Sequence, residues 1–188
     1  MAQLRGKLNS LPIANYVYVL QVLTPLQIRA IDHAVELQDN PIAPEFPTKR
    51  LCLEALRDLF TLLPLCRNDP SDVDIRQKLL IAAYSSLFSL SFTSKVGLSH
   101  SIGHAIGASY GIPHGITSCI SLAPTVHFKA DRNPDEAAQI ARILPYIGSE
   151  SSGNPKTDAH AVGYAINELV VKLGLQSTLS DVSVRWKV

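Results

Sequence analysis

Apolar residues recur every three to four positions along most of this chain, the spacing that places them on one face of an α-helix. Start and stop signals flank these segments: Thr24 precedes Pro25 and Gln27 in a capping box, Asn133 precedes Pro134, and Gly174 follows the last apolar residue. The pattern predicts helices from Thr24 to about Asn40, from Thr48 to before Pro70, from Asp72 to about Leu90, through His100 and His104, from Ala137 to Ile147, and from Thr157 to Leu173.

The helix predicted from Asp72 to about Leu90 is apolar on most of its sides. Tyr84, Leu87, Phe88 and Leu90 follow Leu79, Leu80 and Ile81, so the apolar positions do not form one narrow stripe. A helix that is apolar all round is normally buried. We therefore expect this helix at the centre of a helical bundle.

The residues before the first helix form a separate segment. Its apolar run, Leu11 to Leu23, contains Asn15 and Gln21 and lacks a small-residue cleavage site, so it fits a buried strand better than a signal peptide. The run is also too short to span a bilayer. The sequence predicts an all-α bundle over residues 24–188, a single domain's length of chain, preceded by a strand or arm at residues 1–23.

Composition narrows the class of protein. The net charge is +1, from 17 basic and 16 acidic residues, and no Lys/Arg cluster is longer than a pair, so we expect no nucleic-acid partner. The three cysteines, Cys52, Cys66 and Cys119, are widely spaced and odd in number. This usage favours reduced thiols and a cytoplasmic location over a disulfide framework.

Histidines carry the main chemical signal. His100 and His104 are one turn apart on a predicted helix, so both rings leave the same face, and Gly111 with Pro113 turns the chain so that His114 can meet His100. A single histidine is more often a satisfied core or surface residue, but a group at this spacing is typical of a metal site. The sequence therefore predicts a shared site.

Small residues on the same helix indicate how closely it packs. Ser99, Gly103 and Gly107 follow one another at four-residue spacing, and they do not follow a strand in the pattern of a phosphate-binding loop. We therefore expect a neighbouring helix to approach this face closely.

These motifs resemble the C-terminal, all-helical domain of iron-containing (group III) alcohol dehydrogenases, a dehydroquinate-synthase-like fold, close to the maleylacetate reductases. In that family Asp-Ala-x-x-His-Ala-x-Glu supplies two metal ligands, and residues 29–36 match it except at the first position. A second motif, His-x3-His-x2-Gly with a later Pro-His-Gly, supplies two more ligands and a catalytic-site histidine. This chain has the second motif complete, as His100, His104, Gly107, Pro113, His114 and Gly115.

The resemblance covers about Thr24 to Leu179 and implies residue roles. His33, His100 and His114 become candidate metal ligands, and His104 would face a nicotinamide and the substrate. Arg29, however, stands where the family has its aspartate ligand, and a guanidinium cannot coordinate a cation.

Three interpretations of Arg29 remain open. A zinc or iron site held by three histidines is chemically possible, because catalytic zinc often has three protein ligands. Asp32 does not replace the missing aspartate, since it is rotated about 100° around the helix from His33. In the second interpretation Arg29 replaces the metal as the local positive charge and holds a carboxylate or polarises a carbonyl. In the third it forms an ion pair with Glu36 or Asp32.

A second departure concerns the cofactor. The family's enzymes begin with a nucleotide-binding α/β domain, whereas only 23 residues precede Thr24 here and no glycine-rich pyrophosphate loop is visible. The sequence therefore favours no cofactor, with zinc or iron as the alternative and NAD(P) disfavoured. Loss of a partner domain would also expose apolar surface, so we expect a small-molecule pocket beside Arg29 and a homodimer.

Three functions are compatible with this sequence. The first is a non-redox enzyme, an isomerase, cyclase or lyase acting on a largely apolar carbonyl or carboxyl compound. Arg29 would then be the electrophile, His104 or His114 the general acid or base, and His33 and His100 substrate-binding residues. The second is an NAD(P)-dependent oxidoreductase completed by another chain. The third is a non-catalytic remnant that only binds a small molecule.

Overall fold

The computed structural model describes residues 27–88 and 97–182, and the fold over these residues is all-helical. Residues 1–26, which hold the predicted strand or arm and the Thr24 capping box, lie outside the described residues. The first described helix covers residues 27–38. It is followed by η1 (Glu45–Lys49), α3 (Arg50–Asn68), α4 (Val73–Phe88), α5 (Leu98–Tyr110), α6 (His114–Arg132), α7 (Pro134–Ala141), η3 (Leu144–Ile147) and α8 (Pro155–Lys172).

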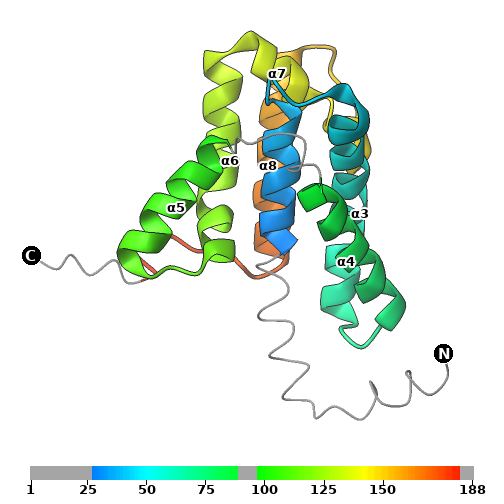
Figure 1. Cartoon of the computed structure of the whole chain (residues 1–188), viewed down its shortest axis with the longest axis vertical. Helices are drawn as coiled ribbons and strands as arrows, with labels where there is room; N and C mark the ends of the chain where they lie inside the picture. The colour runs from blue at the N-terminus through cyan, green and yellow to red at the C-terminus, as the bar shows by residue number, and fades with distance from the viewer. Residues whose placement is uncertain (1–26, 89–96, 183–188) are drawn as a thin grey trace, which may run out of the picture.

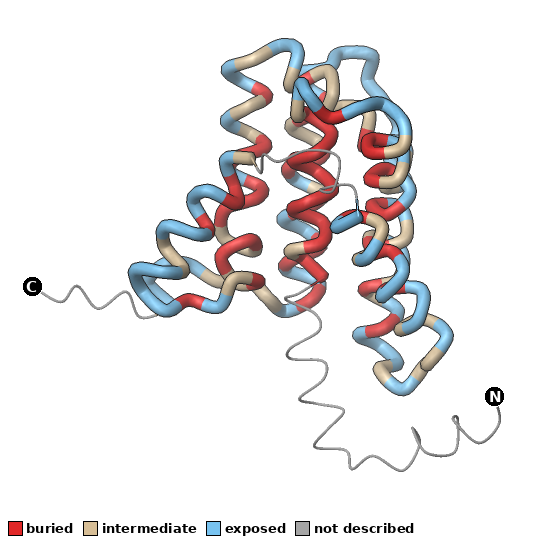
Figure 2. Tube along the Cα trace, in the orientation of Figure 1, coloured by how far each residue is buried: buried red, intermediate tan, exposed pale blue. Residues whose placement is uncertain are grey.

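Two helical hairpins flank a central pair of helices. Figure 1 shows α5 and α6 on one side, α3 and α4 on the other, and the helix over residues 27–38 with α8 between them. Buried residues concentrate on this central pair (Figure 2). Ile31, Leu56, Ile140 and Val162, from four different segments, are fully buried in one core. Both hairpins therefore share a core built on the first described helix and α8.

Local signals set the helix ends as the sequence indicates. The Asn133 side chain accepts hydrogen bonds from the backbone N–H groups of Asp135 and Glu136 and so caps α7, while Gly111 ends α5 with a positive φ of 69°. The predicted helix from Ala137 to Ile147 is shorter than expected. Its α-helical part ends at Ala141, and residues 144–147 form a 3₁₀ turn.

The prediction that the third helix lies at the centre of the bundle is wrong. α4 packs against α3 at the edge of the molecule (Figure 1), and Leu80, Ile81 and Tyr84 are each more than half exposed. Leu79, in contrast, is buried against the core. Apolar side chains make burial favourable, but they do not determine whether the fold supplies another surface for them to pack against.

The exposed apolar face of α4 agrees with the expectation of uncovered apolar surface, while the homodimer stays a prediction. In the described part of the chain, no helix combines the length and the hydrophobicity needed to cross a bilayer.

Candidate functional site

Glu36 anchors the first turn of α5 to the helix over residues 27–38. Its buried carboxylate accepts the backbone N–H of Gly97 at 2.9 Å and of Ser99 at 2.6 Å. A Cβ at Gly97 would collide with this carboxylate, so glycine is required for the close approach. An anion at a helix N-terminus satisfies free N–H groups and is favoured by the helix dipole. Glu36 therefore fixes where the histidine helix begins.

Two carboxylates hold the ring of His100. Its Nδ1 lies 2.9 Å from Glu36 Oε2 and 3.4 Å from Asp32 Oδ2, and the Ser99 hydroxyl donates to Asp32 at 3.1 Å. Burial opposes protonation of His100, but hydrogen bonds and charge from the two carboxylates outweigh it and raise its pKa to about 9. The other nitrogen, Nε2, is buried and has no hydrogen-bond partner. It is therefore the atom left to interact with a ligand.

His33, on the helix over residues 27–38, stacks on His100 of α5. The ring centroids are 4.4 Å apart with an interplanar angle of 26°. His33 Nδ1 is buried without a hydrogen-bond partner. Burial, followed by the positive charges of His100 and Arg29, lowers the pKa of His33 to about 3. This ring is consequently neutral beside a positively charged neighbour.

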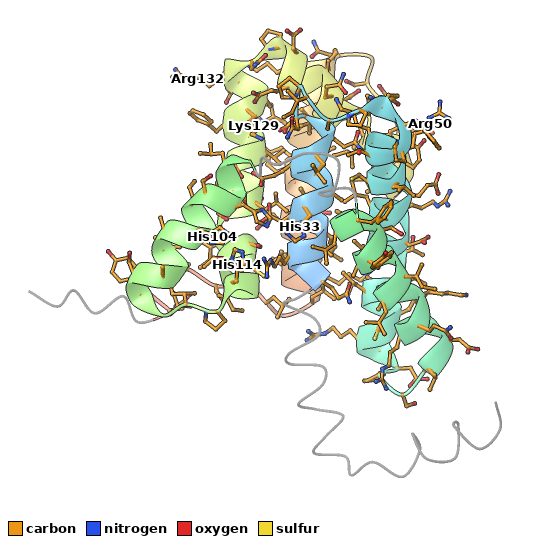
Figure 3. All side chains as sticks on the ribbon, viewed as in Figure 1. His33, Arg50, His104, His114, Lys129 and Arg132 are labelled. Atoms are coloured by element: carbon orange, nitrogen blue, oxygen red, sulfur yellow. The ribbon has the colours of Figure 1, made fainter. Side chains whose placement is uncertain are left out.

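His114 and His104 complete the group (Figure 3). The His114 ring lies edge-on to His100 with centroids 5.5 Å apart, and it is 4.7 Å from the ring of His104. His114 Nδ1 is 3.1 Å from the Thr117 hydroxyl, while its Nε2 is buried without a partner. Burial and then the charge of Arg29 lower the pKa of His114 to about 4. His104 is exposed to solvent.

Close packing of α5 on α6 brings these rings together, as the small residues predict. A Cβ at Gly103 would stand 2.8 Å from the Thr117 hydroxyl oxygen and 3.4 Å from His114 Cε1. A larger residue would push the two helices apart. The spacing between His104 and His114 therefore depends on this glycine.

Arg29 lies one turn before His33 and is partly buried. Its Nε is buried and has no hydrogen-bond partner. Within the described residues, the ion pairs of Asp32 and Glu36 are formed with His100, so these carboxylates are engaged elsewhere. The arrangement supports the interpretation in which Arg29 is a positive charge next to the histidines.

This arrangement departs from a metal centre of the family's kind in its ligand spacing and in its charge. In residues 27–88 and 97–182, the one group whose ligand atoms all lie within 4.8 Å of one another is Asp32, Glu36 and His100. Those carboxylates already accept hydrogen bonds from Ser99 and from the start of α5. The predicted set of His33, His100 and His114 is brought together without reaching that spacing, and Arg29 adds a repelling charge. Metal binding by these histidines stays a prediction.

Sequence reasoning missed the supporting role of Asp32 and Glu36. They are four residues apart, and together with Arg29 and His33 they follow the i, i+3, i+4, i+7 pattern that places all four side chains on one face of the helix. That spacing is visible in the sequence, but their common partner His100 lies more than sixty residues away. A cavity of about 470 Å³ is lined by Glu36, Phe128 and Lys129, among other residues. The apolar pocket expected beside Arg29 stays a prediction.

A comparison with models of protein families found a match for this chain. Residues 27–187 match the model of the Fe-containing alcohol dehydrogenase family, C-terminal. No curated protein matches the sequence.

Solved structures with the same fold include a 1,3-propanediol oxidoreductase at 22% identity, with a TM-score of 0.80 over 88% of this chain and 42% of that one. An iron-containing alcohol dehydrogenase from Thermococcus thioreducens is 20% identical, with a TM-score of 0.72 over 84% and 38% of the two chains. A maleylacetate reductase from Rhizobium sp. is 24% identical, with a TM-score of 0.68 over 88% and 43%. The chain therefore spans about two fifths of these proteins, and identities this low support the shared fold alone.

Proposed function

Because this chain belongs to the iron-containing alcohol dehydrogenase family, as a match to its C-terminal helical domain, we propose that it is a small-molecule enzyme in which Arg29 has taken over the role of the metal. Its substrate is a largely apolar compound with a carbonyl or carboxyl group. The reaction is a non-redox isomerisation, cyclisation or elimination, without NAD. The observation that carries the proposal is the buried, unpartnered Nε of Arg29 beside four gathered histidines.

The residues supply the parts that such a reaction needs. The Arg29 guanidinium donates hydrogen bonds to the substrate's oxygen and stabilises negative charge that develops there. His100, fixed by two carboxylates, presents Nε2 to the same region, and His33 stacks on it. His114 Nε2 or the exposed His104 removes a proton from a carbon next to the carbonyl and returns it to the product. No oxidant or reductant is required.

Binding of a simple apolar carboxylate tests the role of Arg29. We expect benzoate to raise the melting temperature of the wild-type chain and to have little effect on Arg29→Met, because the methionine keeps bulk but removes the charge. Benzamide, a neutral compound of the same shape, is the matched control ligand and should bind weakly to both proteins. Equal stabilisation of Arg29→Met by benzoate, or of the wild type by benzamide, would contradict the proposal.

A second candidate is an NAD(P)-dependent oxidoreductase completed by another chain. The observation that favours it is that His33, His100 and His114 each have a buried ring nitrogen without a hydrogen-bond partner. Histidine nitrogens of this kind can bind a catalytic metal. Titration with NADH and NADPH, followed by nicotinamide fluorescence, separates the two candidates. Saturable binding supports the oxidoreductase and overturns the non-redox proposal. Absence of binding up to about millimolar concentration favours the non-redox enzyme.

Restoring the family's aspartate at position 29 tests whether Arg29 has replaced the metal. Arg29→Asp replaces a repelling cation with an anionic ligand one turn before His33. We therefore expect this variant to bind one more Fe²⁺ per chain than the wild type, measured by metal analysis after dialysis. Arg29→Gln is the control, because it removes the positive charge without adding a carboxylate. Equal Fe²⁺ content in wild type and Arg29→Asp would contradict the assignment of Arg29 as the metal's replacement.

A further inference from the structure

The two remaining histidines form a pair on another part of the molecule. His127 on α6 and His160 on α8 face each other with their Nδ1 atoms 2.8 Å apart. Their rings are stacked, with centroids 5.0 Å apart and an interplanar angle of 23°. The proposed function makes no use of this pair, although it joins α6 of a flanking hairpin to α8 of the central pair.

Asp131 determines which nitrogen of His160 carries the proton. The His160 Nε2 lies 3.3 Å from Asp131 Oδ1, and an ionised carboxylate only accepts hydrogen bonds, so Nε2 is the donor. Asp131 Oδ1 also forms an ion pair with the Lys156 Nζ at 2.8 Å, as an ionised carboxylate does. In the neutral ring, His160 Nδ1 then carries a lone pair directed at His127. Histidines that bind metals are commonly oriented by a carboxylate in this way.

The ring of His127 is held in place by its neighbours on α8. A Cβ at Gly163 would stand 2.7 Å from His127 Cε1 and 2.8 Å from its Nε2, so only glycine leaves room for the ring. The Tyr164 ring lies 4.7 Å from that of His127. The ring is therefore positioned before any ligand arrives, which reduces the entropy lost on binding.

We propose that His127 and His160 bind a divalent late first-row metal ion such as Zn²⁺ through their two Nδ1 atoms, with water completing the coordination. Zn–N bonds of about 2.0–2.1 Å in a tetrahedral site place two nitrogens about 3.3 Å apart, roughly half an ångström beyond their present separation. Small ring rotations provide this difference. His127 shifts its proton from Nδ1 to Nε2 on binding, so no net charge is lost from either ring.

The donor set determines the class of ion. Two neutral imidazoles favour Zn²⁺, Cu²⁺ or Ni²⁺ over Mg²⁺ or Ca²⁺, which prefer oxygen ligands. Asp131 is a positioning residue here, because it acts on the metal through His160. A bound ion would link α6 to α8 and stabilise the folded chain.

Zinc titration of the metal-stripped full chain tests the proposal. We expect Zn²⁺ to raise the melting temperature of the wild type by several degrees and to bind in calorimetry, and we expect His127→Gln and His160→Gln to lose this response. His114→Gln is the matched control, since it removes an imidazole from the other histidine group. Loss of the response in His114→Gln together with its retention in His160→Gln would overturn the proposal. Circular dichroism in EDTA checks that each variant is folded.

A measurement on the wild type avoids dependence on variant folding. Long-range ¹H–¹⁵N spectra report the state of each imidazole nitrogen. Zn²⁺ should shift the Nδ1 resonances of both His127 and His160, while Mg²⁺ at the same concentration should not. Unchanged Nδ1 resonances for these two residues under saturating Zn²⁺ would refute the site. Asp131→Asn should weaken Zn²⁺ binding without abolishing it, because both nitrogen ligands remain.

Discussion

Removing the carboxylate of Glu36 should destabilise the fold more than any exposed acidic substitution. This side chain is 5% exposed and accepts two backbone N–H groups at the start of α5, from Gly97 at 2.9 Å and from Ser99 at 2.6 Å. It also lies 2.9 Å from Nδ1 of His100. Glu36→Ala would leave these two N–H groups without their acceptor and His100 with Asp32 alone.

The expected size follows from these contacts. A hydrogen bond to a charged group contributes about 1.5–3 kcal/mol, and removing one partner of a buried charge pair costs about 3–5 kcal/mol in total. We expect Glu36→Ala to lower the free energy of unfolding by about 3–5 kcal/mol. For a chain of this length that corresponds to a fall of about 10 °C in melting temperature. Glu36→Gln keeps one acceptor oxygen, so its loss should be about half as large.

Urea unfolding followed by far-ultraviolet circular dichroism measures the effect. Glu168→Ala is the matched control, because Glu168 is an exposed glutamate on α8 and its removal should change stability by less than about 0.5 kcal/mol. A Glu36→Ala protein as stable as Glu168→Ala would refute the reasoning that this carboxylate attaches the histidine helix to the core.

Three other predictions test packing and charge. Gly103→Leu should lower the free energy of unfolding in urea by about 1–3 kcal/mol, because a Cβ at this position already meets Thr117. Ala105→Leu, on the exposed side of α5, should be nearly neutral. Equal effects of the two substitutions would contradict close packing of α5 on α6. Burial outweighs the neighbouring Lys129 and raises the pKa of Asp39 to about 6, so its ionisation opposes folding. The free energy of unfolding of the wild type, relative to that of Asp39→Asn, should therefore fall as the pH rises from about 4 to about 7. An increase of this difference over the same pH range would refute the assignment. Leu79→Ala should lower the free energy of unfolding by about 2–5 kcal/mol in the same assay, because Leu79 is buried. Leu80 is exposed, so Leu80→Ala should lower it far less. A similar loss for both substitutions would mean that another surface covers α4 in solution.

The sequence alone predicted the helical class, most helix ends and the candidate site residues. These depend on local rules: Asn133 caps its own helix, Gly111 ends α5, and the four-residue spacing of His100 and His104 places both rings on one face. The turn at Gly111 and Pro113 then brought His114 to His100, and the family motif added His33 to the same site. The structure places all four rings in one group.

Interactions between helices were not predictable in the same way. The apolar surface of α4 indicated a central position, yet Tyr84 is 64% exposed because no described helix covers that side. Glu36 lies 61 residues from Gly97, and the sequence contains no signal that pairs them. The meeting of His127 with His160 depends equally on how α6 packs against α8.

The sequence by itself thus determined most of the helices, although not α6 over His114–Arg132, and the chemical groups that each predicted helix presents, because hydrogen bonding and side-chain period within a helix depend on near neighbours. Only the tertiary structure decided that two carboxylates hold Nδ1 of His100, that its Nε2 is left without a partner, and that Arg29 remains apart from those carboxylates. The physical reason is that contacts between helices are set by the packing of the whole core, where a shift of one helix changes every distance across it.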